Sequence, residues 1–431
     1  MGGNPLTRRR ARCAALAALL LAGAAPAVAW AAADVTVLQV FVHEGGSYLE
    51  DTKVFFEAFE RAHPEIKIEI VPGPAGSSPE EKLSIMVAAG LPPDLARLWN
   101  TKQAAKAGLL QEITPYFERL PPEDQNDLWP PIREALSVDG KLYALPLGTA
   151  VGTYFFNPRL FAERGVGYPD DAWAWEVEGV QELRKLTVDR DGDGRPDVWA
   201  MVRAGGQGYH VYSFIYSAGG GPLFNEAGTQ FLGNNAATVE ALQFLYDLAH
   251  VHNVMPATGS SYTDFINESA ASMLWGSFMV GYFDPFPDLA WDIAQIPTFR
   301  GNRATSLWPE TPYGIPQGAK HPDEAWQVLK FIYSREGQTL AMEMGWGIPP
   351  ARASVAQTAF VRAFPQTNID ALIKMLQSPL NQPTPQQAPS QATSLLVRAF
   401  QDVIAGVKAP RQAIEEVDAA IQAILAESAG R

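Results

Sequence analysis

Cysteine is almost absent from this chain. Cys13 is the only one among 431 residues, and it precedes an apolar stretch near the N-terminus. We expect that part to be removed, so the processed chain contains no disulfide and depends on its hydrophobic core for stability. Cys13 is also not placed to become the lipidated first residue of a mature lipoprotein. The remaining length is ample for two domains.

Motifs of common enzyme classes are missing as well. The chain contains no GxSxG, Walker A or GxGxxG motif, and its six histidines form no HExxH or Cys/His set. A glycosidase needs only two carboxylates, however, and spacing alone neither selects nor excludes such a pair. The acidic residues that leave this alternative open are Glu44, Asp284, Asp288 and Glu310.

Positive charge is in short supply. The chain has 33 Lys and Arg against 47 Asp and Glu, a net charge of −14. Four of these basic residues lie near the N-terminus: Arg8, Arg9, Arg10 and Arg12. No basic run remains elsewhere, which argues against nucleic acid or an anionic membrane surface as a partner.

The first residues have the composition of a secretory signal peptide. The four arginines are followed by an apolar stretch at residues 16–25 and by small-x-small sequences at residues 27–31. The apolar stretch is too short for a membrane-spanning helix. We therefore predict a signal peptide at residues 1–31, cleaved within 29–33, and export to the periplasm or the extracellular side of the cell membrane.

Strand and helix patterns alternate along residues 35–99. Three apolar-rich strands are predicted there, at residues 35–42, 66–70 and 95–99. Strands joined by helical crossovers indicate an α/β layer with mainly parallel strands. Ligands of such sheets bind at the carboxyl ends of the strands, which here are residues 43–46 and Trp99-Asn100.

Residues 143–161 contain two strand-like runs joined by small residues, among them Gly148 and Gly152. Such a segment suits a chain that crosses between two lobes, because small residues can absorb the backbone change of a hinge. We expect the functional cleft beside it. The later patterns are mostly helical, with a Pro- and Gln-rich loop predicted at residues 379–391.

Four tryptophans stand beside glycine, proline or asparagine in predicted loops: Trp99, Trp275, Trp308 and Trp346. Flat aromatic faces stack on the apolar face of sugar rings, while neighbouring polar groups bind the hydroxyls. The alternative is that each of them simply packs in the core or against a loop. The pattern favours a carbohydrate site without deciding it for any single tryptophan.

An aspartate-rich loop is the sharpest chemical motif. Its acidic residues are Asp189, Asp191, Asp193 and Asp197. Aspartates at positions 1, 3, 5 and 9, with Gly194 at position 6, match the first part of an EF-hand calcium loop. Ala200 stands where the loop needs a bidentate glutamate. The loop is therefore either a structural calcium site or a polar turn.

Several segments resemble the family 1 extracellular solute-binding proteins of ABC importers, the maltose-binding-protein-like group. The segment GTYFFNPRLF, residues 152–161, is the most specific, although Phe156 replaces the usual tyrosine. Further matches are YALP at 143–146, the KHP-type helix at 320–332 and the GxxP segment at 347–350. One departure is Trp308-Pro309-Glu310-Thr311, which replaces a glycine pair.

The resemblance implies an α/β, two-lobed periplasmic-binding-protein type II fold. Each lobe would be a mainly parallel sheet flanked by helices, with three hinge crossings near residues 147–152, 295–298 and 347–350. The N-terminal lobe would comprise residues 32–147 plus 296–348. The C-terminal lobe would comprise residues 148–295 plus 349–431.

The resemblance also implies that the chain is not an enzyme. It would capture a mono- or oligosaccharide between its lobes, as a monomer, and deliver it to the transmembrane permease of an ABC transporter. The ligand-binding residues expected by position are Glu44, Trp99, Asn100, Trp275, Trp308, Glu310 and Trp346. Two alternatives stay open: a secreted carbohydrate-active hydrolase, and a binding protein for a phosphorylated polyol.

Overall fold

The computed structural model describes residues 35–43, 46–73, 78–205, 207–283 and 285–429. The predicted signal peptide, Cys13, Glu44 and Asp284 lie outside these ranges. In the part of the chain that is described, no helix combines the length and the apolar character needed to cross a membrane.

The first lobe begins with the predicted α/β layer. Strand β1 (Thr36–Val42) pairs in parallel with β2 (Ile66–Pro72) and with β3 (Leu95–Arg97). Helices α2 (Gly46–Ala62) and α3 (Pro79–Ala88) form the crossovers. The strand patterns predicted for this region are thus confirmed.

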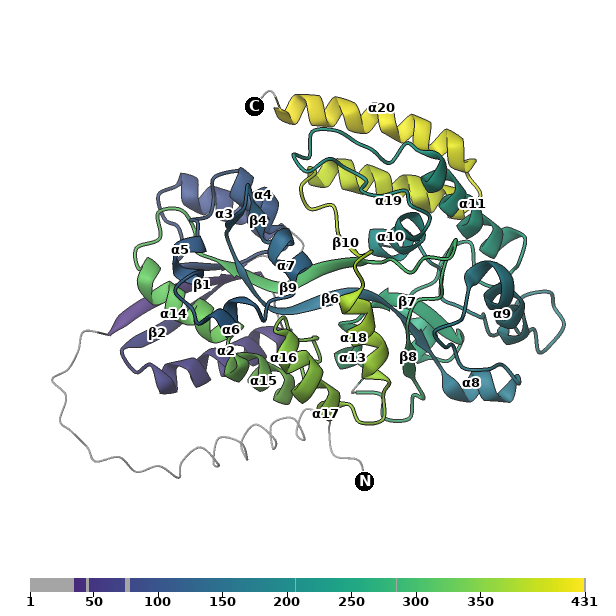
Figure 1. The fold of residues 1–431 in the computed structure, drawn as a ribbon, viewed down its shortest axis with the longest axis horizontal. Helices are drawn as coiled ribbons and strands as arrows, with labels where there is room; N and C mark the ends of the chain where they lie inside the picture. Colours follow the sequence, from purple (N-terminus) through teal and green to yellow (C-terminus); the bar gives the residue numbers. More distant parts are fainter. Residues whose placement is uncertain (1–34, 44–45, 74–77, 206, 284, 430–431) are drawn as a thin grey trace.

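Strand β6 (Leu145–Phe156) joins the two lobes, and all twelve of its residues are buried. Its first half pairs antiparallel with β9 (Ser306–Gly314). Its second half lies between β7 (Ser272–Gly276) and β8 (Asp292–Ala294). In Figure 1, β6 and β9 run side by side through the centre of the molecule, between the purple and blue lobe and the teal one.

Two glycines of β6 are required for packing. A Cβ on Gly148 would lie 2.3 Å from Cγ2 of Ile348, and one on Gly152 would lie 2.2 Å from Oγ1 of Thr305. A close backbone approach of this kind admits only glycine. The small residues that predicted a hinge therefore also let neighbouring segments pack directly on the strand.

The strand directions in the second lobe differ from those expected. Strands β7 and β8 are both antiparallel to β6, so the expectation of a mainly parallel sheet is wrong for this lobe. The reason is that β6 passes through both lobes and is antiparallel to each of its neighbours. The two-lobed α/β fold class itself is confirmed.

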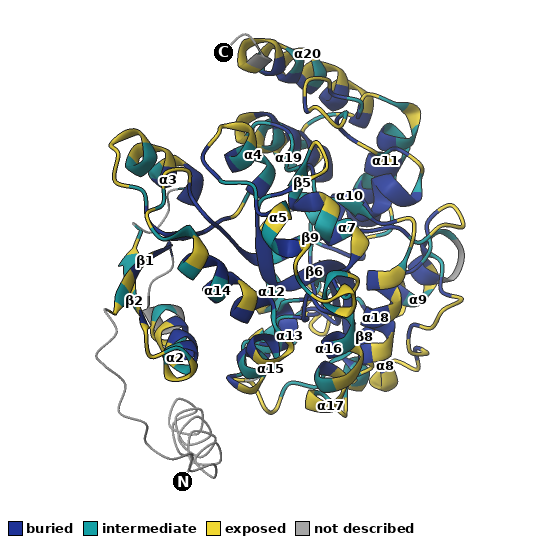
Figure 2. Cartoon of the chain, turned by 60° about the vertical axis from the view of Figure 1, so that its left-hand side comes forward, coloured by how far each residue is buried: buried dark blue, intermediate teal, exposed yellow. Residues whose placement is uncertain are grey.

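Helices cover the sheets on their outer sides. In the first lobe these include α14 (Pro322–Tyr333) and α15 (Arg335–Glu343). In the second lobe the longer helices are α10 (Gly208–Ser217), α11 (Ala236–His250), α18 (Ile369–Gln377), α19 (Ser390–Ile404) and α20 (Pro410–Ala429). Figure 2 shows buried residues along the central strands and exposed ones on the outer helix faces.

Shorter elements complete the described chain. Those between β3 and α10 are α4 (Thr101–Lys106), α5 (Thr114–Phe117), α6 (Pro122–Gln125), α7 (Pro130–Ala135), β4 (Ser137–Val138), β5 (Lys141–Leu142), α8 (Pro158–Glu163), η1 (Trp175–Gly179) and α9 (Val180–Leu186). The later ones are α12 (Tyr262–Ile266), α13 (Met279–Tyr282), α16 (Ala353–Val355), η2 (Ala356–Phe360), α17 (Val361–Ala363) and β10 (Gln382–Pro383).

Residues 296–305 pack against the second lobe. Oγ1 of Thr305 lies 2.9 Å from Oγ of Ser213 on α10, and the carbonyl of Ala304 accepts a hydrogen bond from Ser217 at 3.2 Å. We therefore propose β9, rather than residues 295–298, as the second crossing. The lobe boundaries stay a prediction.

The third expected crossing lies beside the first. The amide of Thr149 donates a 2.7 Å hydrogen bond to the carbonyl of Pro349. Residues 347–350 therefore run next to β6 where that strand passes between the lobes.

Candidate functional site

Six aromatic side chains of the second lobe and β9 form a closed circuit of ring contacts. Each ring centroid lies between 4.9 and 6.4 Å from the next, and all six rings keep some exposure to solvent. We call this group the aromatic circuit; its members in order are Tyr209, Trp308, Phe278, Tyr282, Tyr262 and Trp275. Partly exposed rings held by one another form a preorganised surface for an apolar ligand face.

The strands place these rings by register. Trp275 on β7 is opposite Thr153 of β6, and Trp308 on β9 is opposite Ala150. Gly276 allows the close approach, because a Cβ there would lie 2.3 Å from Phe278 and 3.1 Å from Trp308. The circuit therefore depends on the strand pairing around β6.

His210 lies directly behind the circuit. It is fully buried, and its ring centroid is 4.3 Å from that of Trp275. Its Nδ1 accepts the amide hydrogen of Gly205 at 3.4 Å. Burial and the charge of Arg203 lower the pKa of His210 to about 3, so a neutral imidazole supports Trp275.

Glu310 is the polar group beside the circuit. Nε1 of Trp308 donates a 2.7 Å hydrogen bond to its Oε1. Burial raises the pKa of Glu310, while the bond from Trp308 and the charge of Arg97 act in the opposite direction. A carboxylate has further acceptor capacity after one such bond, so Glu310 can accept from a ligand hydroxyl.

The first lobe contributes a more polar face. Arg97 at the end of β3 is buried, and its Nη2 donates to Oγ1 of Thr311 at 3.3 Å. The ring centroid of His43 lies 4.3 Å from that of Trp99, edge-on. Burial and the charge of Arg97 lower the pKa of His43 to about 4. Trp99 keeps 50% of its surface exposed.

A buried carboxylate holds Trp99 and Asn100 in place. Oε1 of Glu80 accepts both of their backbone N–H groups at 2.7 Å. The side chain of Asn100 caps α4 by accepting the amide hydrogen of Gln103 at 3.0 Å. Asn100 is thus engaged as an N-cap, and its binding role stays a prediction.

Trp346 lies between the lobes at the third crossing. Its ring centroid is 5.3 Å from that of Phe55 on α2. Its backbone packs on α13, because a Cβ on Gly281 would lie 2.5 Å from the Trp346 carbonyl oxygen. The Trp346 ring therefore contacts α2 of the first lobe, while its backbone lies against α13, the helix that carries Tyr282.

The structure brings together Trp275, Trp308 and Glu310, which are linked through Tyr209. Trp99 connects to this group only indirectly, because its ring contacts His43 and the charge of Arg97 acts on both His43 and Glu310. Sequence reasoning missed Arg97 and most of the circuit, namely Tyr209, Tyr262, Phe278 and Tyr282. These tyrosines and Phe278 stand in or next to helices, where an aromatic looks like a core residue. Their ring contacts become visible only in the folded chain.

The aspartate-rich loop brings three of its four acidic residues together. Carboxylate oxygens of Asp189, Asp191 and Asp197 all lie within 4.8 Å of one another, and all three residues are exposed. Hydrogen bonds from the backbone N–H groups of Gly194 and Gly192 lower the pKa of Asp189. Asp193 instead accepts the amide hydrogen of Arg195 at 2.7 Å. The loop can therefore offer oxygen ligands, yet its own amides already stabilise it as a turn.

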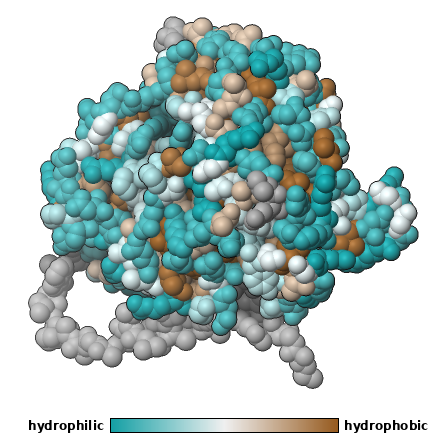
Figure 3. Space-filling view, turned by 45° about the vertical axis from the view of Figure 1, so that its right-hand side comes forward, coloured by the Kyte–Doolittle hydropathy of each residue, from teal (hydrophilic) through white to brown (hydrophobic). Residues whose placement is uncertain are grey.

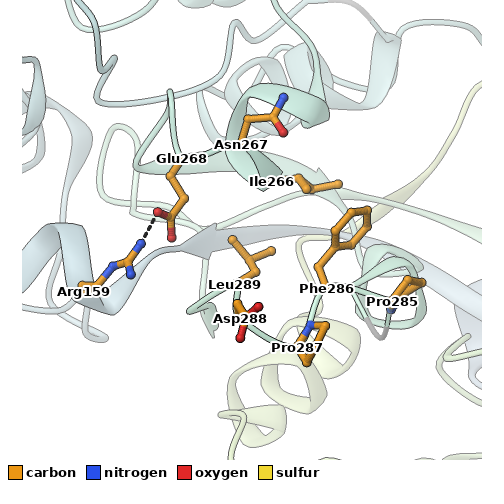
Figure 4. Close-up of a pocket in the computed structure, with 9 residues that line it drawn as sticks. All are labelled: Arg159, Ile266, Asn267, Glu268, Pro285, Phe286, Pro287, Asp288 and Leu289. Carbon is orange, nitrogen blue, oxygen red and sulfur yellow. Dashed lines mark hydrogen bonds and ion pairs between the residues drawn. The ribbon is translucent and has the colours of Figure 1, made fainter. Parts of the chain in front are cut away.

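Asp288 lies in a surface pocket that Glu310 does not line. This surface pocket of about 420 Å³ is lined by residues of the segments 266–268 and 285–289 and by Arg159, which is ion-paired with Glu268 (Figure 4). Of the four acidic residues named for a hydrolase, the two described ones thus belong to separate sites.

Comparisons with known proteins agree with this architecture. The model of the bacterial extracellular solute-binding protein family matches residues 45–339. The arabinooligosaccharide-binding protein of Bacillus subtilis is 27% identical over 310 residues, which are 68% of this chain and 67% of that protein.

Solved structures share the fold. The sugar-binding protein MalE from Xanthomonas citri superposes with a TM-score of 0.77 at 21% identity, covering 91% of this chain and 98% of its own. An ABC substrate-binding protein from Listeria monocytogenes, in complex with cycloalternan, gives 0.76 at 22% identity and covers 91% of this chain and all of its own. Since the family model spans well over half of the sequence, the chain belongs to the bacterial extracellular solute-binding proteins.

Proposed function

We propose that this protein is the substrate-binding component of an ABC importer that captures an oligosaccharide between its lobes. The observation that carries the proposal is the aromatic circuit with Glu310 at its edge. Sugar rings offer apolar C–H faces to aromatic rings and hydroxyls to a carboxylate. The names of its relatives, an arabinooligosaccharide-binding protein among them, support this ligand class.

Closure of the lobes would complete the site. The ligand would stack on the circuit, while Trp99, His43 and Arg97 approach from the first lobe. A ligand that contacts both faces binds the closed form better and shifts the population toward it. The closed form would then be the one that a membrane permease recognises.

We propose binding without turnover. The relatives reported above are named as binding proteins. Glu310 is hydrogen-bonded to Trp308, and Asp288 lies in a surface pocket that Glu310 does not line. A retaining or inverting glycosidase needs two carboxylates on opposite sides of one scissile bond. Incubation with oligosaccharides should therefore leave them intact, and release of shorter sugars would overturn the proposal.

We also propose an exported monomer. Figure 3 shows a mostly hydrophilic face with hydrophobic residues in small groups, which agrees with a protein that works in water. Processing at residues 29–33 can be checked by N-terminal sequencing of the exported protein. The molar mass in solution tests the monomer.

Native mass spectrometry of the purified protein, followed by identification of any released ligand, tests the ligand class. Calorimetry with arabino- and malto-oligosaccharides should then give a Kd of about micromolar or better for one series. A phosphorylated polyol in the released fraction, with no sugar binding, would favour the second alternative.

A further inference from the structure

The Pro- and Gln-rich segment after β10 is held at both of its ends. Strand β10 pairs in parallel with the start of β9, at Ser306 and Leu307. Just before it, Oδ1 of Asn381 accepts the amide hydrogen of Thr305 at 3.1 Å. At its other end Ser390 begins α19. Residues 384–390 therefore have a defined course between two anchors.

This segment reaches across to the first lobe. Nε2 of Gln386 donates a 3.2 Å hydrogen bond to the backbone carbonyl of Trp99. Oγ of Ser390 donates to Oε1 of Gln103 on α4 at 3.1 Å. Both acceptors belong to the edge of the first lobe that carries the half-exposed Trp99 ring.

A turn of the second lobe supports the segment from behind. Gly228 has a positive φ of 72°, and a Cβ there would lie 2.1 Å from the carbonyl oxygen of Gln387. The adjacent carbonyl of Ala227 accepts a 2.7 Å hydrogen bond from Nζ of Lys106 on α4. The turn thus packs on the segment and contacts the same helix.

The side-chain oxygen of Gln386 is available as a hydrogen-bond acceptor. Its Oε1 is buried and has no hydrogen-bond partner among the described residues. If the side-chain amide of Gln386 were flipped, its oxygen would lie against the carbonyl oxygen of Trp99, and two acceptors would face each other. The hydrogen bond to Trp99 therefore identifies the other atom as Oε1. A buried acceptor without a protein donor can accept a hydrogen bond from a donor that arrives with a ligand.

We propose that residues 384–390 are a strap that closes the cleft beside Trp99, and that Gln386 is a specificity-determining residue. Its Nε2 positions Trp99 through the backbone, and its Oε1 accepts a hydrogen bond from a ligand hydroxyl. The inference rests on the proposed function, because it concerns the same cleft.

The first test uses maltotriose and arabinotriose as probes. Gln386→Ala should weaken binding of the bound probe by about tenfold, mainly through faster dissociation. Gln391→Ala, at an exposed position in the first turn of α19, is the matched control and should bind like the parent. Gln386→Glu keeps an acceptor and loses the donor to Trp99, so its affinity should lie between the two. Equal affinity of Gln386→Ala and Gln391→Ala would overturn the proposal.

The second test does not depend on a sugar. Hydrogen exchange of α4 and of residues 384–390 should be faster in Gln386→Ala than in Gln391→Ala, because the strap loses its bond to Trp99. Equal hydrogen-exchange rates in Gln386→Ala and Gln391→Ala would also overturn the proposal of a strap. If neither probe binds the parent protein while exchange responds as expected, the choice of sugar fails and the strap stands.

A chemical crosslink tests closure directly. Gln103→Cys with Ser390→Cys, joined by a short bis-maleimide, ties the strap to α4, and the processed chain has no other cysteine to compete. Dissociation of a prebound probe should slow by about tenfold or more after crosslinking. If the crosslinked protein released its probe as fast as the same double variant without crosslinker, the strap would not gate the cleft.

Discussion

The two faces of the proposed cleft are held by different forces. On the second lobe, aromatic rings from α10, α12, α13, β7 and β9 support one another, with the neutral His210 behind them. On the first lobe, Trp99 is held through its backbone by Glu80, beside the desolvated groups His43 and Arg97. One face is organised by ring packing and the other by hydrogen bonds and charge.

The difference separates binding from stability. Ring contacts at partly exposed positions add modestly to folding and directly offer surface to a ligand. Buried polar groups on the first lobe cost much when a partner is removed. Substitutions on the first lobe should therefore act mainly on stability and its pH dependence, and those on the aromatic circuit mainly on affinity.

The largest expected effect is that of Glu80→Ala. It leaves the backbone N–H groups of Trp99 and Asn100 without their acceptor and removes a carboxylate that is 5% exposed. We expect a loss of about 3 kcal/mol in the free energy of unfolding, measured by urea denaturation. Glu81→Ala, at the exposed neighbouring position, is the control. If both variants lost the same free energy of unfolding, Glu80 would not be the residue that supports this face.

The next effect is acid sensitivity from His43. Its pKa is lowered to about 4 in the folded state from an unfolded value of 6.5. The unfolded chain then binds the proton first, so stability is lost as the pH falls from about 6.5 to about 4, by up to roughly 3 kcal/mol. His43→Gln should flatten that part of the stability curve. An identical slope in the parent and in the variant would refute the assignment.

A smaller effect is expected from the aromatic circuit. Trp275→Ala should weaken sugar binding by about tenfold, near 1.4 kcal/mol, with a smaller change in stability. Phe286→Ala, at an exposed aromatic of the other pocket, provides the control in calorimetry. Trp346→Ala should lower both affinity and stability, because its ring also packs on Phe55. Unchanged affinity in both tryptophan variants would show that the ligand binds elsewhere.

The smallest effect concerns the remote aspartate loop, which belongs to neither face. We propose that Asp189, Asp191 and Asp197 bind a structural calcium ion. Calcium should then raise the melting temperature of the parent by a few degrees, about 1 kcal/mol, and not that of an Asp189→Ala, Asp191→Ala variant. Affinity for sugar should be equal with calcium and with a chelator. No response of the parent to calcium would leave the loop as a polar turn.

Sequence patterns named Trp99 on the first face and Trp275, Trp308 and Glu310 on the second, and their binding roles stay predictions. Residues His43 and Trp99 follow strands β1 and β3, and the position at a strand end is readable from local periodicity. The members of the aromatic circuit come from segments between residues 209 and 308. The local sequence around a helical tyrosine such as Tyr209 does not show whether its side chain contacts a ligand or packs in the core. Such residues are recognisable only after β6, β7 and β9 are paired.

The amino-acid sequence by itself determined the α/β first lobe, the strand character of residues 143–161, the family, and the tryptophans that stand apart from helical faces. These rest on local periodicity, turn chemistry and motif spacing, which act over a few residues. The tertiary structure alone decided the antiparallel pairing around β6, the capping role of Asn100, the aromatic circuit and the hydrogen bond from Gln386 to the Trp99 carbonyl. Each of these joins residues far apart in the chain, and such contacts form only when the whole core packs.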